Sequence, residues 1–254
     1  MKLRVLGCGT SSGVPRIGND WGRCDPSEPK NRRRRVSILV EEADTRILVD
    51  TSPDLREQLL DTDVSDLDAV IWTHDHADHC HGIDDLRQLF HVRGAPVAGY
   101  ARADTLGTLR NRFAYAFEGK DGYPPVVEAA LLPDAVRVGA IDVHVVDQPH
   151  GSITSAGLRF EAGGKSVGYS TDFNGLTAEM TDLFKGVDVW IVDALRRQPH
   201  PTHPHLQQAL EWIDAVQPGR AILTHMDNSM DYAELVAELP GGVEPGYDGL
   251  EVEL

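Results

Sequence analysis

Two kinds of hydrophobic pattern alternate along the chain. Short apolar segments rich in β-branched residues are followed by segments in which apolar residues recur every three or four positions. The first pattern is typical of buried strands, and the second of helices with one apolar face. The pattern predicts strands over Leu3–Leu6, Val36–Glu41, Arg46–Asp50, Ala69–Thr73, Val97–Tyr100, Ile141–Val146, Gly157–Glu161, Ser166–Ser170, Val187–Val192 and Arg220–Thr224. It predicts helices over 53–60, 78–90, 101–113, 175–184, 205–216 and 231–239.

The order of these elements indicates an α/β fold built in layers. Several neighbouring strands are joined by short turns, which favours antiparallel pairs over one fully parallel sheet. The helices between them must then cover the outer faces of the sheets. No linker, low-complexity segment or short repeat interrupts the pattern, so residues 1–254 are predicted to form a single domain.

Histidines gather where predicted strands end. The segment THDHADH, residues 73–79, follows directly on the apolar run that ends in Trp72. His150 and His225 follow two later strands, and Asp172 follows another. Strand ends of a layered α/β domain converge on one edge, where ligand sites form. A single histidine is usually a structural residue, but a group of this size predicts a metal site.

The spacing within this group suits two adjacent metal ions. His74 and His76, two positions apart on an extended turn, can face one cation together. Asp78 and His79 begin the next helix and point to a second position beside the first. Imidazole and carboxylate ligands of this kind suit Zn²⁺, Mn²⁺ or iron. Three later residues complete a ligand set for two ions, in which a carboxylate can bridge: His150, Asp172 and His225.

Composition limits the partners that the chain can have. Its formal net charge of −16 disfavours binding to a long nucleic acid, because neutralising phosphates requires a basic surface. One basic run, Arg32–Arg35, could contact phosphate, form a partner surface, or be a solvated edge before the next strand.

No run of 18 apolar residues is present, so no membrane span is expected. The three scattered cysteines argue against a disulfide framework and predict a cytoplasmic location.

The ordered set of metal-binding residues resembles the metallo-β-lactamase superfamily. The motif His-x-His-x-Asp-His begins at His74, and its three later partners complete a resemblance that covers almost the whole chain. The resemblance implies a four-layer αββα sandwich with a dinuclear site at one edge. It assigns one ion to His74, His76 and His150 and the other to Asp78, His79 and His225, with Asp172 as the bridge.

Four further segments look like the phosphoribosyl cyclic phosphate phosphodiesterases, relatives of the tRNA 3′-processing endonucleases. They are LGCGTSSGVP at 6–15, THPHLQQAL at 202–210, AILTHM at 221–226 and LPGGVEPGYDGLEVEL at 239–254. This branch implies a hydrolase of small cyclic or nucleotide-like phosphodiesters that uses two divalent ions, Zn or Mn. The expected partner is therefore a small phosphate ester rather than a long nucleic acid or a membrane. The chain could also form a homodimer.

Two residues are expected to act directly in the reaction. His203 matches the acid histidine of the family and would protonate the leaving oxygen, with His200 and His205 as competitors. Asp78 is expected to take part in the reaction as well as to bind a metal ion. Residues Asp84, Asp85 and Arg87 follow the motif and could orient its histidines.

Other activities would share the same metal site. A thioester or lactone hydrolase would not need the acid histidine. A tRNA 3′-processing nuclease would need a protruding basic arm, and no segment of that size or charge is present. The aromatic segment 110–125 could form a lid on which a substrate stacks, or it could fill a satellite core.

One feature of the phosphodiesterase branch is missing. Its members hold an additional structural zinc with a Cys-x-Cys-x-x-Cys loop and a histidine three residues beyond the last catalytic ligand. Here Asn19 and Trp21 replace two cysteines, Cys24 remains, and Asn228 takes the histidine position. A structural zinc needs four ligands, so no third metal is expected. The Trp21 ring is expected to become buried in its place, with Asn19 and Asn228 forming hydrogen bonds there.

Overall fold

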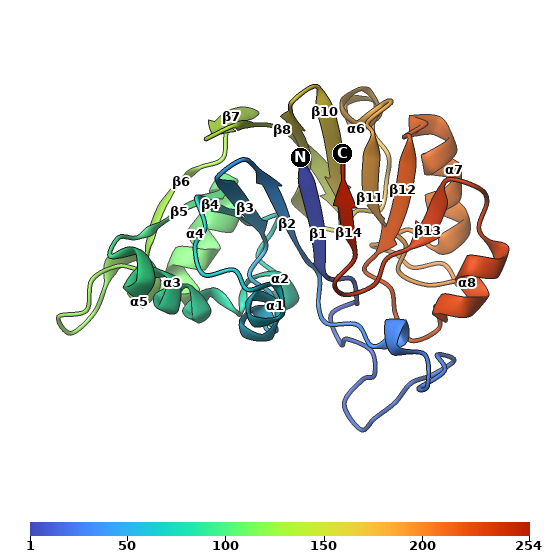
Figure 1. Cartoon of the computed structure of the whole chain (residues 1–254), viewed down its shortest axis with the longest axis horizontal. Helices are drawn as coiled ribbons and strands as arrows, with labels where there is room; N and C mark the ends of the chain where they lie inside the picture. Colours follow the sequence, from blue (N-terminus) through green and yellow to red (C-terminus); the bar gives the residue numbers. More distant parts are fainter.

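Two seven-stranded sheets form the centre of the protein, in a computed structural model that describes all 254 residues. The first sheet has the order β14-β1-β2-β3-β4-β5-β6, and the second has the order β13-β12-β11-β10-β9-β8-β7. Helices lie on the two outer sides, with α1 to α5 beside the first sheet and α6 to α8 beside the second (Figure 1). This arrangement confirms the predicted four-layer αββα sandwich.

The strands of the first sheet are β1 (Lys2–Gly7), β2 (Ser37–Glu42), β3 (Thr45–Val49), β4 (Ala69–Ile71), β5 (Val97–Ala101), β6 (Val127–Leu131) and β14 (Glu251–Glu253). Those of the second are β7 (Ala135–Val138), β8 (Ile141–His150), β9 (Ile153–Ala162), β10 (Lys165–Ser170), β11 (Val189–Asp193), β12 (Arg220–Thr224) and β13 (Val243–Pro245). The helices are α1 (Leu55–Thr62), α2 (Ala77–Cys80), α3 (Leu86–Arg93), α4 (Ala103–Arg112), α5 (Ala114–Glu118), α6 (Ala178–Phe184), α7 (Leu206–Val216) and α8 (Tyr232–Glu238), with 3₁₀ turns η1 (Pro29–Asn31) and η2 (Ile83–Asp85).

Alternation along the strands separates two apolar cores. In β2, Ile38 and Val40 belong to the larger core, which fills the space between the sheets and continues under α6 to α8. Leu39, which points to the opposite face, belongs to a smaller core under α1 to α5. Successive side chains of a strand face opposite sides of the sheet, so a strand buried on both faces is apolar throughout.

The directions of the strands bring the candidate site residues to one edge of the two sheets. The pairs β3–β4, β10–β11 and β11–β12 are parallel, so their carboxyl ends lie together. Strand β8 runs antiparallel to β9, which runs antiparallel to β10, so the carboxyl end of β8 reaches the same edge. The residues after these strands can therefore meet, although they are far apart in the sequence.

Several elements differ from the predicted ones. The helix predicted over 78–90 is divided into α2, η2 and α3. Gly82 lies between α2 and η2, where a Cβ would clash with the Ser52 carbonyl oxygen, so only glycine allows the chain to pass this close to Ser52. The pattern also missed α5, β6, β7 and the three-residue strands β13 and β14, which are too short or too polar for a clear period.

The loop between β1 and β2 is held by a buried arginine. Arg33 is 2% exposed, and its guanidinium donates to the carbonyl oxygens of Met230 at 2.6 Å and Asp227 at 3.3 Å. One of its nitrogens lies 3.9 Å from the Cys24 sulfur. The solvated-edge interpretation of Arg32–Arg35 was therefore wrong for Arg33, which supplies a fixed cation at the centre of this loop.

The expectation for Trp21 was also wrong. Its ring is only half-buried and lies under the guanidinium of Arg32, 5.4 Å from the ring centre. Its N–H donates to the Asn19 side chain at 3.2 Å, as expected. Asn228 also forms a hydrogen bond in this loop, donating to the Asp20 side chain at 3.2 Å. A buried guanidinium that donates to two carbonyl oxygens, rather than an indole ring, thus holds this loop together.

No helix of the structure combines the length and the apolar character that crossing a lipid bilayer would require.

Candidate metal centre

All seven predicted metal ligands lie at the carboxyl edge of the two sheets. The residues come from the turn after β4 and helix α2, the end of β8, and the turns after β10 and β12. Two of them, Asp172 and His225, adopt left-handed backbone conformations with φ of 53° and 57°. Such conformations are uncommon for residues other than glycine and are concentrated at functional sites. Here the backbone bends sharply as each strand ends.

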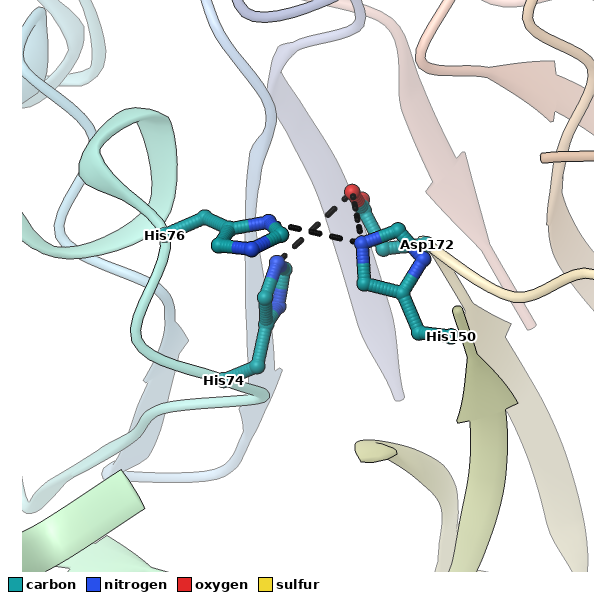
Figure 2. A group of neighbouring side chains, drawn as sticks. All are labelled: His74, His76, His150 and Asp172. Carbon is teal, nitrogen blue, oxygen red and sulfur yellow. Dashed lines mark hydrogen bonds and ion pairs between the residues drawn. The ribbon is translucent and has the colours of Figure 1, made fainter. Parts of the chain in front are cut away.

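Four residues make up the first ligand group, which Figure 2 shows pointing toward a common centre. The Oδ1 oxygen of Asp172 lies 3.6 Å from the Nε2 atoms of both His74 and His150. His76 places its Nδ1 atom 3.4 Å from Nε2 of His150. These ligand atoms lie within 4.8 Å of one another, which allows one ion to contact all four.

A second ligand group lies against the other oxygen of the same carboxylate. The Oδ2 atom of Asp172 is 3.1 Å from Nε2 of His79 and 3.4 Å from Nε2 of His225. Asp78 places its Oδ2 atom 3.4 Å and 3.5 Å from the same two nitrogens. Asp172 therefore presents one oxygen to each histidine group, which is the geometry of a carboxylate that bridges two ions.

Hydrogen bonds fix which ring nitrogen of three ligand histidines is free. His79 and His150 donate from Nδ1 to the Asp50 carboxylate at 2.7 Å and to the Thr202 carbonyl at 3.0 Å. The Thr73 hydroxyl donates its one proton to Asp50, so it accepts from Nδ1 of His74 at 3.0 Å. Each Nε2 atom is left with its lone pair toward the centre, as a metal requires.

The unpaired atoms of the centre fit a pair of divalent ions. The Nε2 atoms of His74 and His79 are fully buried and have no hydrogen-bond partner. Buried polar atoms without a partner are rare and costly in a folded protein. Mixed imidazole and carboxylate donors are suited to Zn²⁺ or Mn²⁺. The donor set and its unpaired nitrogens thus fit the cofactors that the sequence predicted.

The buried carboxylates and imidazoles of the centre shift one another's pKa values. Burial would raise the pKa of Asp172, but the imidazoles of His225, His79 and His74 outweigh it and hold this pKa well below its usual value. Burial disfavours charged His225, yet carboxylates including Asp172 outweigh it and raise the pKa of His225 to about 9. Near neutral pH the imidazole is protonated, so a cation that binds here must displace a proton.

Two aspartates that sequence reasoning missed support the ligands from behind. Asp50 is fully buried and has φ of 63°, and it receives hydrogen bonds from Thr73 and His79. Asp193 accepts from the backbone N–H of Asp172 at 3.0 Å. Each lies at or directly after the end of a strand, β3 and β11. The rule that located the histidines could therefore have located both of them.

His203 lies beside the two ligand groups. Its Nδ1 donates to Asp193 at 2.8 Å, and its Nε2 lies 3.8 Å from Asp172. Its ring stacks on His225 with 4.8 Å between centroids. This bond places a proton on Nδ1 and orients the ring, so that Nε2 faces the centre. His200 lies farther out, 5.1 Å from the His203 ring.

Comparisons with known proteins agree with this geometry. The family model described as the beta-lactamase superfamily domain matches residues 45–226. The solved structure of a new diphosphatase from the PhnP family is 35% identical, with a TM-score of 0.91 over 99% of this chain and 96% of that one. The chain belongs to the metallo-β-lactamase superfamily and to its PhnP branch. This confirms the superfamily and the branch that the sequence motifs indicated.

Other relatives of this PhnP-branch chain carry different names. An octanoyltransferase from Porphyromonas gingivalis is 33% identical over 258 residues, which cover 99% of this chain and 51% of that protein. The chain thus spans about half the length of that relative. Coenzyme PQQ synthesis protein B from Methylobacterium radiotolerans is 24% identical over 100% of both chains. Human short-form tRNase Z, 16% identical with a TM-score of 0.73, shares the fold.

The structure bears on two further predictions about the surroundings of the site. Arg87 pairs with Asp84 at 2.7 Å on the surface rather than orienting the motif histidines. In the segment 110–125, Phe113 packs against His81 and Phe117 against Trp72, which favours the satellite-core interpretation for these rings.

Substituting the shared carboxylate should weaken ion binding on both sides. We expect Asp172→Asn to lose about 100-fold or more in affinity for Zn²⁺ or Mn²⁺, because even the partners that hold ligand histidines contribute about 10- to 100-fold each. Titration calorimetry and elemental analysis after desalting measure this effect. The matched control is Asp75→Asn in the same motif, whose carboxylate contacts Arg112 and belongs to neither ligand group. Two tightly held ions in Asp172→Asn would rule out a bridging carboxylate.

Proposed function

We propose that this chain is a dinuclear-metal phosphodiesterase that hydrolyses small cyclic or nucleotide-like phosphodiesters. The observation that carries the proposal is the Asp172 carboxylate, whose two oxygens each face a separate group of histidines. In this proposal His74, His76 and His150 hold one ion, and Asp78, His79 and His225 hold the other. Two divalent ions so placed supply an activated water and stabilise the charge that develops on a phosphoryl group under attack.

The side chains of this protein would then position the substrate and move protons. His203 holds a proton at Nε2, which faces the centre, and transfers it to the alkoxide that leaves the phosphorus. Asp193 accepts from Nδ1 of the same ring and holds the ring in this orientation. Asp78 acts here as a ligand of the second ion, since its Oδ2 atom lies 3.4 Å and 3.5 Å from the Nε2 atoms of His79 and His225.

Both the relatives and the charge support a small phosphate substrate. The PhnP-family relative is described as a diphosphatase, so cleavage of a small diphosphate is a second candidate for this chain. A formal net charge of −16 opposes binding of a polymeric polyanion. A thioester substrate is a third candidate, since the Porphyromonas gingivalis relative is named an acyl transferase. That reaction gives no role to a histidine held by an aspartate beside the ions.

A substrate panel separates these candidates. Protein loaded with Zn²⁺ or Mn²⁺ should hydrolyse bis-p-nitrophenyl phosphate and a cyclic ribose phosphate faster than a short acyl thioester, a lactone or a nucleoside diphosphate sugar. The Asp172→Asn variant should abolish all metal-dependent turnover, which excludes a contaminating enzyme. Faster cleavage of the thioester, or of a precursor tRNA, than of every small diester would contradict the proposal.

Removing the proposed acid histidine should lower kcat most for substrates with poor leaving groups. A general acid typically contributes about 10²- to 10⁴-fold, and p-nitrophenolate leaves without a proton. We therefore expect His203→Ala to lower kcat by about this factor for an alkyl phosphodiester and much less for bis-p-nitrophenyl phosphate. The competitors serve as matched controls, and His200→Ala and His205→Ala should lack this selectivity. Equal losses on both substrates would assign His203 to binding instead.

A further inference from the structure

His76 differs from the other histidines of the first ligand group in how its ring is held. The rings of His74 and His150 are each oriented by a hydrogen bond at Nδ1, with Thr73 and with the Thr202 carbonyl oxygen. His76 instead turns Nδ1 toward His150, and its Nε2 atom has no hydrogen-bond partner in the protein (Figure 2). Its side chain is also exposed, whereas the other two are buried. The direction of the His76 ring therefore depends on the backbone that carries it.

That backbone is held from outside by the end of α4. Arg112, the last residue of α4, donates from one guanidinium nitrogen to the carbonyl oxygen of Asp75, which lies between His74 and His76. A second nitrogen of the same guanidinium lies 3.3 Å from the Asp75 carboxylate. The Cys80 thiol, on α2, lies 3.4 Å from the same carbonyl oxygen. Arg112 thus ties the turn that carries His76 to a helix outside the metal-binding motif.

The end of α4 is itself packed against the motif. Phe113 follows Arg112 directly, and its ring lies edge-on to His81, with 5.5 Å between the ring centres. His81 is the residue at which α2 ends. On its inner side α4 buries Leu106 and Leu109 in the smaller apolar core. Arg112 therefore projects from a well-packed helix, and its guanidinium can fix the position of the turn relative to that helix.

The charge of Arg112 does not explain why it lies here. Its side chain is 43% exposed, and an ion pair between exposed side chains usually contributes little to stability. A positive charge close to the centre would also oppose the binding of cations. The Asp75 carboxylate pairs with this charge, so the contact reaches the motif without an unpaired positive charge beside the ions. What remains is the hydrogen bond to the backbone oxygen, which acts on the position of the turn.

We propose that Arg112 is a positioning residue for the first metal ion. By holding the Asp75 carbonyl oxygen, it fixes the turn that points Nδ1 of His76 toward His150 and Asp172. The proposal rests on the two-ion centre of the proposed function, and it does not depend on the substrate.

The second ion should not depend on this contact. Its ligands Asp78 and His79 lie on α2, and His225 follows β12. The ring of His79 is held by the fully buried Asp50 carboxylate. Loss of Arg112 should therefore weaken the binding of one of the two ions and spare the other.

Two other roles for Arg112 give different results. A basic residue in the last turn of a helix stabilises that helix through its dipole. In that role Arg110, in the same turn, would matter equally, and loss of either residue would lower the melting temperature and weaken both ions alike. If Arg112 acted through its charge alone, its removal would strengthen the binding of cations. A positioning role predicts a loss of affinity that is confined to one ion.

The test measures the two ion affinities of Arg112→Ala and Arg112→Lys by calorimetry with Mn²⁺. Arg112→Ala should lower the affinity for one ion about 10- to 100-fold, as expected for a partner that orients a metal ligand, and leave the other ion and the melting temperature of the metal-free protein unchanged. Arg112→Lys keeps the charge but lacks the planar fork, so it should lose affinity at the same ion. Arg110→Ala is the matched control, since Arg110 donates to a carbonyl oxygen outside the motif, that of Ala129, and it should bind both ions like the unmodified protein.

Nuclear magnetic resonance then shows whether the affected ligand is His76. A histidine that binds Zn²⁺ through Nδ1 carries its proton on Nε2, whereas His74 and His150 carry theirs on Nδ1. Ring-nitrogen spectra of the zinc-loaded protein should therefore distinguish His76 from these two. In Arg112→Ala, the His76 signal should return to that of an unbound ring at a zinc concentration that saturates the unmodified protein, while the signals of His79 and His225 stay unchanged.

Unchanged or tighter binding of both ions in Arg112→Ala, or an equal loss of both, would overturn the proposal. An unmodified protein that holds only one ion would contradict the two-ion centre of the proposed function instead. The affinity of Arg112→Ala for that single ion would still decide the role of Arg112, since a loss with a shifted His76 signal supports it and an unchanged affinity rejects it.

Discussion

Asp172 is an almost fully buried carboxylate with histidine nitrogens on both of its oxygens, and the rest of the site depends on this contact. A buried carboxylate is costly unless it is paired and hydrogen-bonded. The Thr171 hydroxyl donates to Oδ2 of Asp172 at 2.7 Å. Four imidazole nitrogens lie 3.1 to 3.6 Å from the carboxylate, two on each oxygen, where bound cations would complete its pairing. The same negative charge raises the pKa of His225 and would draw divalent cations into the centre. One side chain therefore sets the geometry, the protonation state and the affinity of the site.

The sandwich places these side chains at one edge of its two sheets. Rigid, fully apolar strands such as β4 and β11 end at a common edge, and the polar residues follow at once. Asp50, Asp172 and His225 leave their strands with positive φ values, a strain that the surrounding hydrogen bonds must hold. Asp193 does part of this by accepting from the backbone of Asp172 and from His203, so it links a metal ligand to the proposed acid. In the proposed mechanism, metal binding and proton transfer would be coupled through that one carboxylate.

The sequence could predict which side chains meet at this edge because metal chemistry limits candidate ligands to a few residue types at recognisable spacings. The strand ends that carry them are apolar enough to be recognised by their period. The supporting residues were harder to find, since an aspartate such as Asp50 could as well begin a turn. Arg33 was missed for a different reason: a basic run normally lies in solvent, and only the folded chain shows which of its four arginines is enclosed by carbonyl oxygens.

The most direct test of the account is anomalous diffraction from crystals grown with Mn²⁺. The account predicts two peaks, one on each side of the Asp172 carboxylate and about 3.5–4 Å apart, as in other two-metal hydrolytic sites. It also predicts no peak near Cys24, where the Arg33 guanidinium lies. A single ion at the centre, or two ions that do not share Asp172, would contradict the account.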